Sequence, residues 1–464
     1  MRTTTETTQR LTTGLPGGAE PPLWQTYLAF LGPMIVSNIL QALSGTINNI
    51  YLGQMLGVSA MASVSAFFPV LFFLISFMVG LGAGASVLIG QAWGAKEVDT
   101  VKAIAGTTLT VGACAGLVVA VFGGAFTGTM LVALGTPTDI LPGATAYARI
   151  VLLAAPGIFI FLLVTSMLRG VGDTKTPLLT LVLATIIGLA VTPALIQGWF
   201  GLPQLGVASG AYAAVLSYVL SLAWTGWYLL RKRSPLAPDA AFRKHLRIDR
   251  VLLGKVLRIG LPTALSMITL SLSEVAVLFL VNRYGSQATA AYGAVNQIVS
   301  YVQFPAISIA ITASILGAQA IGAGRTHILG SIARTGILMN LALTGTLVLL
   351  GYLFSRYILG LFITDAAVVE LAQTLLHIML WGSVIMGMSM VLSGLMRASG
   401  TVLVPTAISM FAIGCIQVPV AWWLSRRYGL NGIWAAYPVA FLAMLAMQTA
   451  YYRLVWRKLR IERL

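Results

Sequence analysis

The stretch Leu261–Val281 reads LPTALSMITLSLSEVAVLFLV. It holds one charged side chain, Glu274, and its other residues are apolar, small or hydroxylic. A helix rises about 1.5 Å per residue, so a run of about 20 apolar residues crosses the hydrocarbon core of a bilayer. Lipid offers no hydrogen-bond partners to the backbone, so a span of this kind is helical. We therefore predict a transmembrane helix here.

Runs of this type recur along the whole chain. Hydrophobic residues make up 58% of the sequence and charged residues 9%, whereas about a quarter of a soluble chain is charged. We predict an all-α integral membrane protein with about twelve transmembrane helices. Their predicted centres are Val36, Phe73, Gly112, Pro156, Ile186, Leu216, Met267, Ile309, Ala342, Met386, Phe411 and Phe441.

The basic residues lie in alternate connections. The chain carries 28 Lys and Arg and a formal net charge of +16. Only Arg149 falls within a predicted span, and four arginines fall in connections on the opposite side from the rest: Arg283, Arg356, Arg426 and Arg427. This bias predicts a multi-pass protein of the inner (plasma) membrane with both termini and the central loop in the cytosol. The cations indicate contact with anionic membrane lipids and no nucleic-acid site.

The two halves of the sequence resemble each other. Arg169 and Arg397 occupy one pair of matching motifs, and Pro33 and Pro262 end another pair with nearly the same spacing. The longer matches are MLRGVGDTKTP (Met167–Pro177) with MRASGTVLVP (Met396–Pro405), and GQAWGAK (Gly90–Lys96) with AQAIGAG (Ala318–Gly324). Six spans per copy give both copies the same orientation, as in parallel transporter repeats. The sequence thus predicts two pseudo-symmetric six-helix lobes.

We divide the chain accordingly. The predicted parts are a disordered cytosolic tail (1–22), an N-lobe of six spans (23–230), a basic cytosolic linker (231–253), a C-lobe of six spans (254–456) and a basic cytosolic tail (457–464). Two lobes facing a central cavity can rock and expose the cavity to each side in turn, which favours a carrier. We expect a monomer.

Glu274 is the main candidate for coupling to an ion. The other eleven acidic residues fall in tails, loops or span ends. A carboxylate at this depth costs about 2.5–3.5 kcal/mol on insertion scales, and such residues mark ion or proton paths. We predict that Glu274 exchanges H⁺ or Na⁺. We expect no other metal ion at this protein. The alternative is a buried neutral glutamate that hydrogen-bonds to Ser271, to Ser273 or to a neighbouring span.

Other polar side chains are candidates for lining a solute path. Asn38, Gln41 and Asn48 share one face of the first predicted helix. The second-half candidates are Asn296, Tyr301, Gln303 and Met386. The alternatives are hydrogen bonds between helices for the amides and core filling for methionine. Pro33 and Pro262 lie near the starts of the first and seventh spans, where proline kinks a helix or begins it.

An enzyme is not predicted. The three histidines, His245, His327 and His377, fall in different parts of the predicted topology and cannot meet. Cys114 and Cys415 lie far apart within apolar runs, so neither a disulfide framework nor a thiolate metal site follows. We expect no cofactor.

The residues resemble those of the multidrug and toxic compound extrusion (MATE) transporters over about residues 24–456. The stretches that carry the resemblance are PMIVSNILQALSGTINNIYLGQMLG from Pro33, GASVLIGQAWGAK from Gly84, MLRGVGDTKTP from Met167, NQIVSYVQFPAISIAITASILGAQAIGAG from Asn296 and MRASGTVLVP from Met396. The chain is most similar to bacterial members. The resemblance implies two six-helix lobes, a central cavity and export driven by inward H⁺ or Na⁺.

The resemblance also assigns roles to single positions. Glu274 matches the seventh-span glutamate that couples cations in many members, and Pro33 matches the first-span proline. The chain departs from the family pattern at Asn48, where the DNA-damage-inducible branch carries an aspartate. It departs again near Met386, where other members carry an acid. The resemblance therefore implies that the second lobe carries the ion coupling.

These observations lead to one functional prediction and two alternatives. We predict a secondary antiporter that exports amphipathic, cationic organic compounds in exchange for H⁺ or Na⁺ by alternating access. Its expected partners are small organic solutes, the coupling ion and membrane lipids. The alternatives are a flippase for a lipid-linked precursor and a non-transporting membrane receptor or scaffold.

Overall fold

The computed structural model describes residues 22–464, and the predicted disordered tail lies outside the described residues except for Pro22. The described chain is helical, with no strand. Eleven helices are long and apolar enough to cross a membrane, and a bent pair adds a twelfth span. The prediction of about twelve transmembrane helices, six in each copy, is confirmed.

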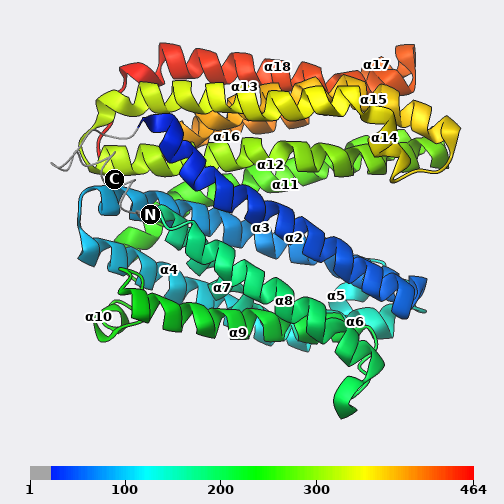
Figure 1. Ribbon diagram of the computed structural model, residues 1–464, viewed down its shortest axis with the longest axis horizontal. Helices are drawn as coiled ribbons and strands as arrows, with labels where there is room; N and C mark the ends of the chain where they lie inside the picture. The colour runs from blue at the N-terminus through cyan, green and yellow to red at the C-terminus, as the bar shows by residue number, and fades with distance from the viewer. Residues whose placement is uncertain (1–21) are drawn as a thin grey trace. The chain divides into compact units, whose positions relative to one another are not determined.

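The first copy contributes six spans (Figure 1). They are α2 (Leu23–Met55), α3 (Val58–Gly94), α4 (Val98–Val118) with the π-helical turn Val119–Gly123, the pair α6 (Leu141–Leu153) and α7 (Ala155–Gly170), α8 (Lys175–Gln197) and α9 (Ala208–Lys232). The pair bends by 56°. Pro156 is the second residue of α7 and lacks the N–H that would continue the ladder from α6, which explains the break. Short helices α5 (Thr127–Ala133) and α10 (Ala240–Arg243) lie in connections.

The second copy contributes the other six spans. They are α11 (Arg250–Asn282), α12 (Ser286–Gly322), α13 (Leu329–Leu353), α15 (Ala366–Ala398), the interrupted helix α16 (Leu403–Met410) with α17 (Val418–Tyr428), and α18 (Leu430–Leu454). The interruption between α16 and α17 is the π-helical segment Phe411–Gln417. Helix α14 (Ser355–Gly360) is a single short turn of helix after α13.

Contacts divide the described chain into two compact units. Unit 1 comprises residues 22–35, 94–96 and 261–464, and unit 2 comprises residues 36–93 and 97–260. The first helix of each copy changes unit close to its proline, α2 after Ile35 and α11 after Gly260. The lobe boundaries that we drew from the sequence remain a prediction.

Unit 1 is built around α15. Helices α12, α13 and α18 pack along it and run lengthwise beside one another (Figure 1). Close approach requires small residues, since a Cβ on Gly394 of α15 would lie 2.5 Å from the carbonyl oxygen of Ala310 in α12. The first turns of α2 join this unit through the buried Tyr27, whose hydroxyl donates to the carbonyl of Ile332 at 2.8 Å.

Unit 2 packs α4 on α7 and α9 on α8. Thr180 of α8 and Thr225 of α9 hydrogen-bond through their hydroxyls at 2.6 Å. Asp173 precedes α8 and is buried. Its carboxylate accepts from the backbone N–H of Thr176 at 3.0 Å and from the ammonium of Lys232 at 2.9 Å. These contacts tie the cation-bearing end of α9 to the start of α8.

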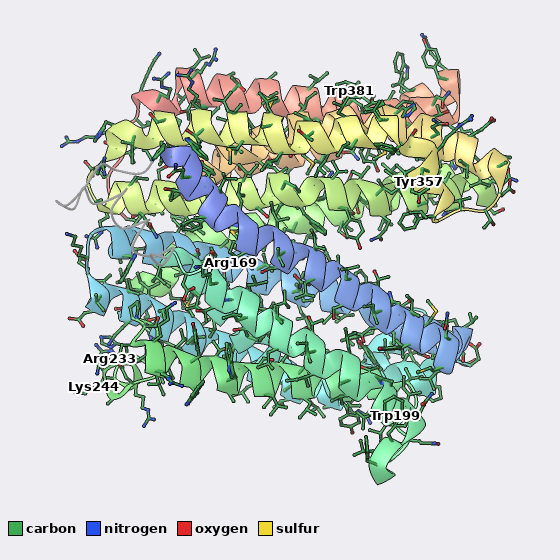
Figure 2. All side chains as sticks on the ribbon, viewed as in Figure 1. Arg169, Trp199, Arg233, Lys244, Tyr357 and Trp381 are labelled. Carbon is green, nitrogen blue, oxygen red and sulfur yellow. The ribbon has the colours of Figure 1, made fainter. Side chains whose placement is uncertain are left out.

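The basic segment between α9 and α11 folds onto α4. Lys102 of α4 forms an ion pair with Asp239 at 3.4 Å. A Cβ on Gly106 would lie 2.1 Å from the carbonyl oxygen of His245, so the segment approaches the α4 backbone directly. The buried Phe242 of α10 anchors it. The exposed cations of this region are Arg231, Lys232, Arg233, Arg243, Lys244, Arg247 and Arg250. Figure 2 labels Arg233 and Lys244, beside α10.

Candidate functional site

Unit 1 contains a small polar cavity between α11, α12, α15, the π-helical segment and α18. Its volume is about 100 Å³. The lining residues are Leu270, Glu274, Asn296, Val299, Ser300, Gln303, Met379, Ser383, Met386, Gln417, Tyr437 and Phe441. Seven of these twelve residues carry polar side chains, and one of them is the intramembrane acid Glu274, which makes the cavity the candidate functional site.

The cavity brings together four residues that we singled out from the sequence. Glu274 comes from α11, Asn296 and Gln303 from α12, and Met386 from α15. Met386 is buried with the apolar core of unit 1 as well as lining the cavity. Tyr301 is not among the lining residues, and its ring lies edge-on to Phe304 at 5.5 Å.

Glu274 is the only acid that lines the cavity. It lies eight residues before the end of α11 at Asn282, a distance of about 12 Å along the helix axis. Within the described residues Glu274 has neither a salt bridge nor a hydrogen bond. The neighbouring Ser273 instead donates its hydroxyl to the carbonyl of Ile413 in the π-helical segment at 3.5 Å. The alternative of a glutamate held by Ser271 or Ser273 therefore has no supporting contact.

One side of the cavity wall is fixed by its own hydrogen bonds. The hydroxyls of Tyr437 and Tyr292 lie 2.8 Å apart and hydrogen-bond to each other. Tyr292 stacks on Trp434, with ring centroids 5.7 Å apart. Ser300 donates to the backbone carbonyl of Asn296 at 2.8 Å. These polar groups are held in place by protein partners.

Two lining residues carry fully buried polar atoms that have no such partners. Ser383 and Gln417 are each 1% exposed. Within the described residues, the Ser383 hydroxyl and both the amide nitrogen and the amide oxygen of Gln417 lack a hydrogen-bond partner. A buried polar group without a partner costs about 1–3 kcal/mol, and both residues line the cavity. We did not single out either residue from the sequence, although Gln417 is the only amide between Leu403 and Trp423.

The first-helix candidates belong to unit 2. Asn38, Gln41 and Asn48 follow one another on the part of α2 that starts at Val36. Gln41 is exposed and the other two are half-buried. The amide oxygen of Asn48 is buried and has no partner among the described residues. The cavity of unit 1 contains none of them.

Neither proline begins its helix. Pro33 lies ten residues inside α2, and Pro262 lies twelve residues inside α11. Both helices begin well before their prolines, at Leu23 and Arg250. Of the two roles that we considered, only a distortion within a continuous helix remains. No group of three or more His, Cys, Asp or Glu residues within 22–464 could hold a metal ion.

A duplicated bundle of membrane-spanning helices with a buried polar site in one copy is the architecture of a membrane carrier. The sequence profile of the MatE family matches residues 33–194 and again 262–423. The chain therefore belongs to the MatE family, the MATE transporters that its sequence resembles. The two matches begin at Pro33 and Pro262, the pair of prolines that the internal repeat aligns.

Relatives and solved structures agree with this assignment. The chain is 45% identical over 448 residues to the probable multidrug resistance protein YoeA of Bacillus subtilis (strain 168), covering 96% of this chain and 97% of that one. It is 26% identical to the probable multidrug resistance protein NorM of Thermotoga maritima, covering 90% of each chain. A crystal structure of MATE in complex with MaD3S has the same fold, with a TM-score of 0.86, 22% identity and coverage of 96% of this chain and 97% of that one.

The repeat shows that the polar cavity is specific to the second copy. When the two family matches are superposed from Pro33 and Pro262, Glu274 corresponds to Gly45. Ser383 corresponds to Ala154 in this register and to Ala155 in the adjacent register, which aligns Arg169 with Arg397. Gln417 corresponds to Gly188 in the first register and to Leu189 in the second. The carboxylate and its two unpartnered neighbours therefore belong to the second copy alone.

Proposed function

We propose that this protein is an ion-driven antiporter that exports amphipathic, cationic organic compounds in exchange for H⁺ or Na⁺. Membership of the MatE family and 45% identity to a probable multidrug resistance protein support the export of organic compounds. The observation that carries the ion coupling is the cavity around Glu274 in unit 1.

The size of the cavity favours an ion over an organic solute. Pockets that take drug-sized ligands measure about 300–1,000 Å³, whereas this cavity measures about 100 Å³. A polar space of that size holds a few waters or a partly hydrated cation. An acid within a membrane span is expensive and usually marks an ion path. Glu274 therefore serves as the group that takes up H⁺ or Na⁺.

The organic solute binds elsewhere. The face of α2 that carries Asn38, Gln41 and Asn48 offers amides that can orient a solute, and the unpartnered oxygen of Asn48 supports this role. Pro33 and Pro262 are the hinges of alternating access. Each lies in a helix that changes unit within three residues of the proline, where the missing backbone hydrogen bond weakens the helix.

The protein works in the plasma membrane with both termini and the folded basic segment in the cytosol. The exposed cations around α10 support this orientation, because cytoplasmic connections carry the excess of Lys and Arg.

Efflux from proteoliposomes tests the proposal. Purified protein is reconstituted, an inward H⁺ or Na⁺ gradient is imposed separately, and the release of a panel of fluorescent organic cations is followed. We expect at least one gradient to accelerate release and Glu274→Gln to abolish that acceleration. Glu370→Gln is the matched control, because Glu370 lies on α15 in an exposed pair with Arg356, and such pairs contribute about 0–1 kcal/mol. Undiminished gradient-driven efflux by Glu274→Gln would refute the coupling role.

A further inference from the structure

We infer that Arg283, Arg426 and Arg427 form a binding site for the phosphate of an acidic membrane lipid at one rim of unit 1. The site lies at the membrane end where α11 finishes, whereas α11 starts at the other end, in the basic segment. It is separate from the cavity around Glu274, whose lining includes none of the three arginines. The proposed orientation implies the outer leaflet for this rim, and the site itself does not depend on that orientation.

Contact between two helix ends brings the three arginines to the same rim. Arg283 directly follows α11, and Arg426 and Arg427 lie in the last turn of α17. The Tyr284 hydroxyl donates to the backbone carbonyl of Ser425 at 3.1 Å. The residue after Arg283 therefore contacts the residue before Arg426, and the two helix ends form one surface.

Each of the three guanidinium groups lies over an aromatic ring one helical turn earlier. The distances from the guanidinium carbon to the ring centre are 3.8 Å for Arg426 over Trp422, 4.8 Å for Arg427 over Trp423 and 5.0 Å for Arg283 over Phe279. The ring attracts the cation and orients it. The planar fork of N–H groups can then donate two parallel hydrogen bonds to a phosphate.

These three arginines have no acidic partner in the protein. Within residues 22–464, none of them forms an ion pair. A fourth arginine at this end of unit 1, Arg356, differs because it pairs with Glu370 at 3.9 Å and donates to the Gln373 side chain at 3.1 Å. Three neighbouring cations without an acid favour a ligand that supplies the negative charge.

The cluster is specific to the second copy. The corresponding connections of the first copy, residues 56–57, 124–140 and 198–207, contain neither Lys nor Arg. Membrane proteins concentrate Lys and Arg in their cytoplasmic connections, so orientation does not account for arginines at the opposite end. An anionic ligand at this rim does account for them.

The depth of the aromatic rings favours a lipid over a soluble anion. Phe279 lies in the last turn of the spanning helix α11 and is 62% exposed. Trp422 and Trp423 belong to the span that ends at Tyr428 and are exposed as well. Tryptophan is enriched at the level of the lipid headgroups. The guanidinium groups stacked on these rings therefore lie where lipid phosphates are, and their charge complements an acidic lipid.

Quenching by brominated lipids tests the inference at the site itself. Purified full-length protein is reconstituted in phosphatidylcholine with increasing fractions of dibrominated phosphatidylglycerol, and a parallel series contains dibrominated phosphatidylcholine. Bromine quenches nearby tryptophans, and the rim signal is the part that disappears when Trp422 and Trp423 are both replaced by Phe. We expect about a fivefold or greater preference for phosphatidylglycerol in the wild type and no preference in the triple variant Arg283→Gln, Arg426→Gln, Arg427→Gln.

Matched variants separate a built site from a general attraction of charge. Arg356→Gln removes a cation at the same end of unit 1 that is already paired (Figure 1), so it should leave the preference unchanged. Replacing the three arginines by lysine keeps the charge and removes the planar fork, and the preference should fall by about twofold or more. Full preference in the lysine variant would overturn the inference. Earlier unfolding of the glutamine variant with the preference intact would also overturn it, because the arginines would then only stabilise the C-terminal end of α17.

Further outcomes distinguish the lipid from free phosphate and the site from the proposed function. Glycerol phosphate, added at the concentration of the phosphatidylglycerol, should leave the rim quenching unchanged, and displacement by it would overturn the assignment to a lipid. Ion-driven efflux by a wild type that shows no lipid preference would overturn the site and leave the proposed function in place. A preference that the glutamine variant loses, in a protein that exports no solute, would support the site and refute the proposed function.

Discussion

Replacing Asp173 tests the packing of unit 2 most quantitatively. Its buried carboxylate accepts from the Thr176 N–H at 3.0 Å and from Lys232 at 2.9 Å. Loss of a capping side chain costs about 0.5–2 kcal/mol, and a hydrogen bond to a charged group contributes about 1.5–3 kcal/mol. Stranding a fully buried charge would cost about 3–5 kcal/mol. Lys232 is 33% exposed and stays hydrated without its partner, so we expect Asp173→Ala to lose about 2–3 kcal/mol of stability.

The loss of stability should increase with the number of hydrogen-bond acceptors that the substitution of Asp173 removes. Asp173→Asn keeps one oxygen for the Thr176 N–H but loses the charge that Lys232 faces, so we expect a loss of about 1 kcal/mol. The assay is unfolding of the purified protein in mixed micelles by titration with sodium dodecyl sulfate, followed by tryptophan fluorescence. Asp139→Ala is the control, because this aspartate is exposed and surface substitutions usually stay within about 0.5 kcal/mol.

A double-mutant cycle with Lys232→Met checks that the ion pair contributes to the loss. Residues in one network are non-additive by about 0.5–3 kcal/mol, so the double variant should lose less than the sum of the two single losses. A loss for Asp173→Ala no larger than that of the surface control Asp139→Ala, or additive losses in the cycle, would contradict the reasoning.

Three further predictions concern a hinge, a helix contact and a loop. Pro262→Ala should leave thermal stability unchanged or higher, since proline disfavours a helix interior by about 3 kcal/mol, but should slow gradient-driven efflux; unaltered efflux rates would argue against a hinge. Gly394→Ala places a Cβ 2.5 Å from a backbone carbonyl oxygen of α12 and should destabilise the protein by about 1–3 kcal/mol. A Cβ on Gly345 meets no atom within 4 Å, so Gly345→Ala should be neutral in the same detergent titration. The hydrogen bond from the Phe242 N–H lowers the pKa of Asp239 from its ordinary value of 3.8, and Lys102 lowers it further. The ionised Asp239 carboxylate therefore stabilises α10 above pH 3.8, and this stabilisation is lost as the pH falls through the lowered pKa. Hydrogen exchange of α10, relative to α9, should speed up in that acid range, and Asp239→Asn should remove the pH effect.

The sequence predicted the spans and the main acid because both depend on composition. Runs of about 20 apolar residues leave little choice but a transmembrane helix, and Glu274 is conspicuous as the one acid within such a run. The repeat predicted two copies because the matching motifs keep a nearly constant spacing. These features require no knowledge of which helices touch.

The rest of the site depends on tertiary structure. Gln417 enters the cavity because it ends a π-helical segment, and such a segment has no simple sequence pattern. Ser383 matters because its hydroxyl has no partner within the described residues, which only the packed helices reveal. The basic segment after α9 contacts α4 through the backbone at Gly106, a contact that charge patterning alone could not predict.

In the proposed mechanism, solute export is coupled to ion entry through Glu274. It is tested most directly by measuring both fluxes at once, with a fluorescent organic cation as solute and a trapped indicator for Na⁺ or H⁺ in the same proteoliposomes. An imposed solute gradient alone should drive ion movement in the opposite direction in wild type and in Glu370→Gln, and none above protein-free vesicles in Glu274→Gln. Ion movement in Glu274→Gln equal to that of wild type would contradict the account.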